Sequence, residues 1–120
     1  MRRKLTKGAR LHVGAEIRRV IRGGRRVKAG PYIVYGQQAT LSAGSRIVVI
    51  VPRRTGTQVV RNSIKRTFRE AFRLTRGGWH QNWDLVIYVR SSPKIITMQG
   101  AAQVLEKAVK SYELSPEKNG

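Results

Sequence analysis

A row of basic side chains recurs along residues 61–73, at spacings that bring the side chains together on a helix. The members are Arg61, Lys65, Arg66, Arg69 and Arg73, with the amide of Asn62 among them. At about 100° per residue, with Arg61 at zero, all six fall between zero and about 140° on the helical wheel. Guanidinium groups grip phosphate through two hydrogen bonds and stack on bases. The chemistry that this basic row could perform is therefore the binding of a polyanion.

A charge-rich helix face is more often solvated surface than a binding site. A solvated face, however, mixes signs so that residues four apart attract each other, and like charges at that spacing cost about 0.2–0.5 kcal/mol per pair. Glu70 is the only acid in this stretch, and it can pair with Arg66 or Arg73. The basic row therefore favours an external polyanion. With about five phosphates neutralised, log affinity should fall against log salt with a slope of about −4.

The composition of the whole chain indicates the same kind of partner. In 120 residues, 25 Lys and Arg oppose 6 Asp and Glu, for a formal net charge of +19. A small basic domain of this kind is typical of nucleic-acid binding. The longest aliphatic run, Ile47–Val51, is too short to cross a membrane, and the absence of cysteine excludes disulfides and thiolate chemistry. We expect a cytoplasmic protein with no membrane partner.

The elements that must position the basic row follow from hydrophobic periodicity and turn signals. The sequence predicts helices at Gly14–Arg22, Thr57–Arg76 and Met98–Tyr112. It predicts strands at Arg25–Ala29, Tyr32–Gln38, Arg46–Val51 and Asp84–Arg90. We therefore expect one domain over residues 1–120, an α/β sandwich of a four-stranded sheet with three helices in the order αβββαβα. Residues 1–10 are predicted to be a loose basic arm and residues 115–120 a frayed tail.

The segment RNSIKRTFREAFR at residues 61–73 closely resembles the signature helix of the bacterial ribonuclease P protein family, approximately R-N-R-x-K-R-x-x-R-E-x-[FY]-R. Upstream, RIVVIVPRRTG at residues 46–56 is similar to the strand and basic loop of that family. The resemblance covers about residues 10–112. It implies an unusual left-handed crossover from the third strand through the basic helix to the fourth.

The resemblance also implies a function. The family's protein binds a catalytic RNA through the basic helix and holds the 5′ leader of precursor tRNA in a cleft between the first helix and the sheet. Magnesium ions held by the RNA perform the hydrolysis, so the protein itself would contribute no catalytic residue and bind no metal. One protein is expected per RNA. By position, the residues bordering the cleft would be Ile17, Ile21, Tyr32 and Tyr35.

The chain departs from the family pattern at two places. Ser63 stands where the family usually has a second arginine, so one RNA contact is missing. Ile17 and Ile21 replace aromatic residues that usually line the cleft, and base stacking needs a π face. Binding of the catalytic RNA should be little affected, whereas leader recognition loses part of its basis.

Other residues with chemical potential are assigned by their surroundings. Arg53 and Arg54 lie beside the start of the basic helix, which favours RNA contact over a merely solvated loop. Tyr32 and Tyr35 are three residues apart in a strand and so point to opposite faces; leader contact is favoured more for Tyr35. Trp79 and Trp83 more often cap a core than stack on bases. The histidines, His12 and His80, are read as surface residues.

Two other classes of protein fit parts of the sequence. A structural ribosomal protein would share the size, charge and fold type. A protein-only nuclease or a DNA-binding module is a third alternative, but the six carboxylates show no pattern of paired acids for two-metal hydrolysis.

Overall fold

The computed structural model describes residues 14–39, 44–90 and 96–114 of the 120. The elements are α1 (Gly14–Gly23), β1 (Arg25–Ala29), β2 (Tyr32–Gln38), β3 (Arg46–Ile50), η2 (Arg53–Thr55), α2 (Gln58–Thr75), η3 (Arg76–Gly78), β4 (Trp83–Val89) and α3 (Met98–Leu114), where η is a 3₁₀ turn. The predicted order is confirmed, and the predicted bounds agree within two residues. The predicted arm at 1–10 and tail at 115–120 lie outside the described residues.

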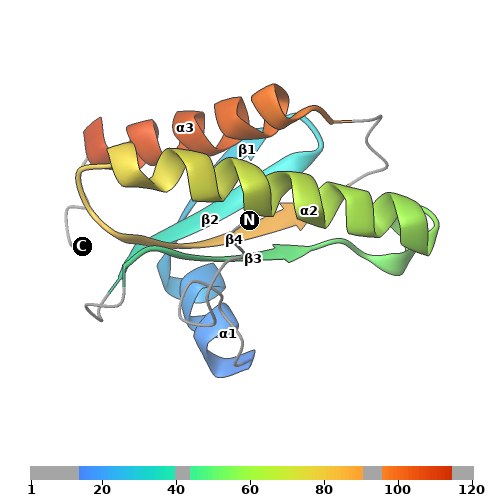
Figure 1. Cartoon of the computed structure of the whole chain (residues 1–120). Coiled ribbons are helices and arrows are strands. Elements are labelled where there is room, and N and C mark those ends of the chain that lie inside the picture. Colours follow the sequence, from blue (N-terminus) through green and yellow to red (C-terminus); the bar gives the residue numbers. More distant parts are fainter. Residues whose placement is uncertain (1–13, 40–43, 91–95, 115–120) are drawn as a thin grey trace.

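One mixed sheet forms the middle layer, with strands in the order β1-β2-β4-β3 (Figure 1). β1 and β2 form an antiparallel hairpin whose turn contains Gly30 at φ 62°, a backbone conformation that glycine adopts readily. β2 also pairs antiparallel with β4, whereas β3 and β4 are parallel neighbours. Parallel strands need a crossover connection, and α2 supplies it.

The main core lies between one face of the sheet and helices α2 and α3, which run side by side over that face (Figure 1). Alternate strand residues such as Val34, Ile47 and Leu85 point into this core. Near its α3 side, a Cβ added at Gly36 would lie 2.2 Å from the ring of Tyr112, so only glycine leaves room for that ring. The Tyr112 hydroxyl donates to the carbonyl of Val34 at 2.9 Å, and burial raises its pKa well above the ordinary value.

Of the described helices, α1 is the one that lies on the opposite side of the sheet (Figure 1). Its apolar contact is small, because Val20 and Val86 are the fully buried members of that cluster. Partly buried side chains complete it: Ile17, Ile21, Tyr35, Val48 and Ile50. We call the sheet surface formed by Ile33, Tyr35, Val48, Ile50, Val86 and Tyr88 the α1 face, since strand pairing places these side chains on one side.

Candidate nucleic-acid interface

The helix that carries the basic row begins with a side-chain cap. The Oγ1 atom of Thr57 accepts a hydrogen bond from the backbone N–H of Val60 at 3.2 Å, which satisfies one of the donors left unpaired at a helix start. The helix then buries Ile64, Phe68, Ala71 and Phe72 against the sheet. This apolar stripe fixes the rotation of α2, and with it the direction in which the basic row points.

The basic row runs along the flank of α2 that is turned away from α3. Thr75 lines a hollow together with Glu106, Val109 and Lys110 of α3, so the Thr75 side of α2 faces that neighbour. Arg66 is nine residues from Thr75, which at about 100° per residue places it on the opposite side of the helix. The fold therefore leaves this flank without a neighbouring helix among the described residues.

The side chains of the basic row differ in their exposure to solvent. Asn62 and Arg66 are exposed, whereas Arg61, Lys65, Arg69 and Arg73 are half-buried. The buried Phe72 falls at about 20° on the wheel, between Arg61 and Lys65, so the row begins at the border of the apolar stripe. The long stems of these side chains thus pack along the protein while their charged ends reach solvent.

Part of the row is neutralised within the protein. Arg73 is paired with Glu70, and the hydrogen bonds to that carboxylate raise the pKa of Arg73 above its ordinary value. Arg61 donates from Nε to the carbonyl of Gly56 at 3.2 Å, which leaves its charge unneutralised. Lys65 and Arg66 have no ion-pair partner within residues 14–39, 44–90 and 96–114. Lys65 and Arg66 therefore keep their positive charge without an anion from the described residues.

Arg53 and Arg54 extend this charge beyond the helix. Both are exposed in the turn η2, directly before α2 begins. The Nη2 atom of Arg54 lies 3.3 Å from the hydroxyl oxygen of Tyr88, to which it donates. Because Tyr88 belongs to the α1 face, the turn joins the basic row to the other side of the sheet.

The two tyrosines of β2 lie on opposite faces, as their spacing predicts. Tyr35 is half-buried on the α1 face together with Ile17 and Ile21. Tyr32 is 5% exposed in the main core, where its ring meets Phe68 edge to face at 5.1 Å between centroids. The assignment of Tyr32 to the border of a cleft beside α1 is therefore wrong, because strand alternation turns its side chain toward α2.

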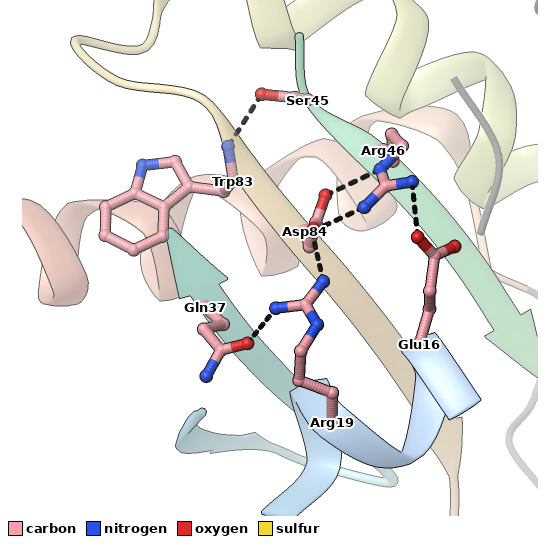
Figure 2. Close-up of polar contacts among 7 residues, drawn as sticks. All are labelled: Glu16, Arg19, Gln37, Ser45, Arg46, Trp83 and Asp84. Atoms are coloured by element: carbon pink, nitrogen blue, oxygen red, sulfur yellow. Dashed lines mark hydrogen bonds and ion pairs between the residues drawn. The ribbon is translucent and has the colours of Figure 1, made fainter. Parts of the chain in front are cut away.

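A buried ionic network fastens α1 to the sheet (Figure 2). Asp84, 0% exposed at the start of β4, accepts hydrogen bonds from Arg46 at 3.0 and 2.9 Å and from Arg19 of α1 at 2.8 Å. Arg46 also donates to Glu16 of α1 at 3.1 Å, and Arg19 donates to Gln37 of β2. The two carboxylates and two guanidinium groups balance in charge. The network therefore sets the position of α1 without adding to the positive surface.

This network and Tyr88 are the parts of the site that sequence reasoning missed. The alternation of Asp84, Val86 and Tyr88 along β4 placed them on one face, but identifying that face required the pairing of β4 with β2 and β3. Trp79 and Trp83 flank the core end as predicted, with Trp83 5% exposed and Trp79 packed on Phe72. His80 is exposed, and His12 lies outside the described residues.

Apart from the exposed Glu106, the carboxylates of the described residues are engaged in contacts within the fold. Besides Asp84, Glu16 and Glu70, Glu113 of α3 accepts from the backbone N–H groups of His80 and Gln81 and from the indole of Trp83. The described part of the chain contains no group of three or more His, Cys, Asp or Glu side chains that could hold a metal ion. In the same residues, no helix is both long enough and apolar enough for a membrane span.

Comparison with known proteins agrees with this arrangement. The chain is 31% identical over 118 residues to a ribonuclease P protein component of Caldanaerobacter subterraneus, covering 98% of each. It is 40% identical over 101 residues to that of Desulfotalea psychrophila, covering 79% of this chain and 82% of the relative.

Solved structures show the same fold. A mutant ribonuclease P protein of Staphylococcus aureus superposes with a TM-score of 0.76 at 25% identity, covering 89% of this chain and 90% of that one. The ribonuclease P protein of Thermotoga maritima does so with a TM-score of 0.72 at 22% identity, covering 85% and 96%. The family model for ribonuclease P matches residues 5–113. Nearly the whole chain, with its basic helix, thus belongs to the ribonuclease P protein family.

Proposed function

We propose that this chain is the non-catalytic protein subunit of a cytoplasmic ribonuclease P, with one copy bound to each catalytic RNA. The basic row of α2 and the arginines of η2 bind the catalytic RNA. The α1 face contacts the 5′ leader of precursor tRNA. The assembly promotes maturation of the tRNA 5′ end. Family membership favours this function over a structural ribosomal protein, a protein-only nuclease or a DNA-binding module.

The observation that carries the proposal is the uncompensated charge of two adjacent members of the basic row. Lys65 and Arg66 stand on the flank away from α3, with no acid partner in the described chain. Each phosphate that such side chains neutralise releases counterions, which is a favourable contribution at moderate salt. RNA fits this surface better than membrane lipid, because the cations are mounted on a rigid helix and not beside a lipid-inserting segment.

In this proposal the chain's residues position RNA and leave the chemistry to it. Magnesium ions held by the catalytic RNA supply the hydrolytic chemistry. Four of the five described carboxylates engage arginines, backbone amides or an indole, and the fifth, Glu106, is exposed on α3, which supports placing those ions on the RNA. The protein's positive charge lowers the repulsion between two polyanions, so that less magnesium is needed for catalytic RNA and precursor tRNA to associate.

The test measures cleavage of precursor tRNA by the cognate catalytic RNA at low magnesium, with and without the purified chain. We expect the chain to cut nothing by itself and to restore cleavage that the RNA alone performs poorly. Lys65→Gln with Arg66→Gln should weaken this effect, while Glu106→Gln, an exposed acid on α3, should not. No stimulation by the unmodified chain at low magnesium would contradict the proposal, as would metal-dependent cleavage by the protein alone.

A further inference from the structure

Tyr88 occupies a distinct place on the α1 face. It pairs with Ile33 of β2 on one side and with Ile50 of β3 on the other, in the middle of the sheet. It is half-buried and lies one alternate position beyond Val86, which α1 covers. Tyr88 is outside that α1 cluster. Its ring therefore stands on the part of the face that α1 leaves uncovered among the described residues.

Tyr88 and Tyr35 form a pair of aromatic rings on one surface. Tyr35 is directly opposite Val86, and Tyr88 lies two residues farther along β4, which makes the tyrosines diagonal neighbours. Diagonal neighbours on adjacent strands are about 7–8 Å apart. The apolar side chains that α1 packs on this surface are all aliphatic: Ile17, Val20 and Ile21. Because base stacking requires a π face, the aromatic surface of this chain comes from the strands and not from the helix.

Arg54 adds a positive charge at the rim of this aromatic surface. Its guanidinium donates to the Tyr88 hydroxyl at 3.3 Å, and it has no carboxylate partner in the described part of the chain. The phenol is neutral, so this hydrogen bond orients the guanidinium without neutralising it. A ring with a cation beside it offers stacking to a base and charge to the adjoining phosphate.

We infer that Tyr88 and Arg54 form a binding site for one nucleotide of single-stranded RNA, with the base on the tyrosine ring and the phosphate on the guanidinium. The site lies where the α1 face meets the turn that begins the basic row, so a strand crossing the face reaches it before the catalytic-RNA surface. The assignment of the 5′ leader as that strand rests on the proposed function.

The test uses the holoenzyme assembled from the full chain and the cognate catalytic RNA. It measures Kd for precursor tRNA with a single-stranded leader and for the same tRNA without one, and takes the ratio as leader discrimination. Tyr88→Leu removes the ring, Tyr88→Phe keeps the ring but removes the acceptor for Arg54, and Arg54→Gln removes the charge. Arg53→Gln is the matched control, because it makes the same charge change in the same turn.

We expect Tyr88→Leu to lower leader discrimination by about fivefold or more, the effect of losing one stacked base. Tyr88→Phe should keep most of it. Arg54→Gln should lower leader discrimination and reduce the salt slope of the leader's contribution to binding by about one, the value for one phosphate contact. Arg53→Gln should instead weaken the binding of both tRNA substrates by the same factor. Unchanged discrimination in Tyr88→Leu would overturn the site. An equal loss in Tyr88→Phe and Tyr88→Leu would overturn the stacking of a base.

The controls separate this inference from the proposed function. Because Tyr88 is half-buried, the affinity of each Tyr88 variant for the catalytic RNA alone reports whether that variant has folded. If the unmodified holoenzyme shows no leader discrimination, the proposed leader contact fails. If it discriminates and Tyr88→Leu discriminates equally, the proposed function stands and the nucleotide site is wrong.

Discussion

Removing the charge of Asp84 should lower the free energy of unfolding far more than the small change in side-chain size suggests. Asp84→Asn keeps the shape of the side chain but leaves Arg46, whose side chain is 8% exposed, with Glu16 as its remaining carboxylate. Glu16 is 31% exposed and can neutralise that charge only partly. Breaking a buried ion pair by removing one partner costs about 3–5 kcal/mol. Since Asn retains one acceptor oxygen, we expect a loss of about 3 kcal/mol.

The loss should appear as a lower midpoint in urea denaturation followed by the fluorescence of Trp79 and Trp83, of which Trp83 adjoins Asp84 in β4. For a domain of this size, 1 kcal/mol corresponds to about 3–5 °C in Tm, so Tm should fall by about 10–15 °C. Glu106→Gln is the matched control. It also removes one acid from a chain of net charge +19, but Glu106 is exposed. The increase in general repulsion is thus common to both variants.

A difference below about 0.5 kcal/mol between Asp84→Asn and Glu106→Gln would refute the reasoning, since surface substitutions vary by that much. A double variant gives a second check. Asp84→Leu with Arg46→Met removes both charges and replaces them with apolar groups of similar size. Such replacement of a buried pair is often neutral or stabilising. We expect the double variant to be more stable than Asp84→Asn; equal or lower stability would show that the penalty is not an uncompensated charge.

Three further predictions follow from other parts of the structure. Arg66→Gln should leave the free energy of unfolding within about 0.5 kcal/mol and lower the salt slope of binding to the catalytic RNA by about one; an unchanged slope would make Arg66 solvated surface. Gly36→Ala should destabilise the fold by about 1–3 kcal/mol in urea, because its Cβ would meet the Tyr112 ring at 2.2 Å, and a neutral result would contradict that packing. Burial raises the pKa of Tyr112 from its ordinary 10.0, so the folded state disfavours the phenolate and the free energy of unfolding should fall as pH rises above about 10. Tyr112→Phe should abolish that part of the fall, measured by urea denaturation at a series of alkaline pH values. An identical fall in Tyr112→Phe would refute the prediction.

The sequence predicted the elements well because their signals are local. Glycines and prolines mark the turns, and the aliphatic run at Ile47 and its neighbours needs no partner to be recognised as a buried strand. The rotation of α2 follows less well from the wheel alone. Val60 falls at about 260°, near the buried Ile64 at about 300°, yet it is 42% exposed, while Phe72 at about 20° is fully buried. That difference moves the apolar stripe of α2 toward Lys65 and explains why four of the six side chains of the basic row are partly covered.

The site residues that escaped prediction depend on contacts between distant segments. Asp84 and Arg46 are 38 residues apart, and Arg19 and Asp84 are 65 apart, so no spacing rule connects them. Arg54 and Tyr88 are joined across 34 residues for the same reason. The alternation of side chains along β2 predicted that Tyr32 and Tyr35 lie on opposite faces, but only the position of α1 showed that Tyr35 belongs to the α1 face.

The small number of acids is what allows one chain to be both folded and strongly cationic. Asp84 and Glu16 hold α1, and Glu113 joins α3 to the segment before β4. Around the fully buried Asp84 the dielectric constant is low, which strengthens its contacts. All three carboxylates are used in contacts within the fold and so do not neutralise the basic surface. The basic row has Glu70 at its end, paired with Arg73. Repulsion between neighbouring cations of the row costs only a few tenths of a kcal/mol per pair in water. The fold tolerates this cost, and bound RNA would remove it.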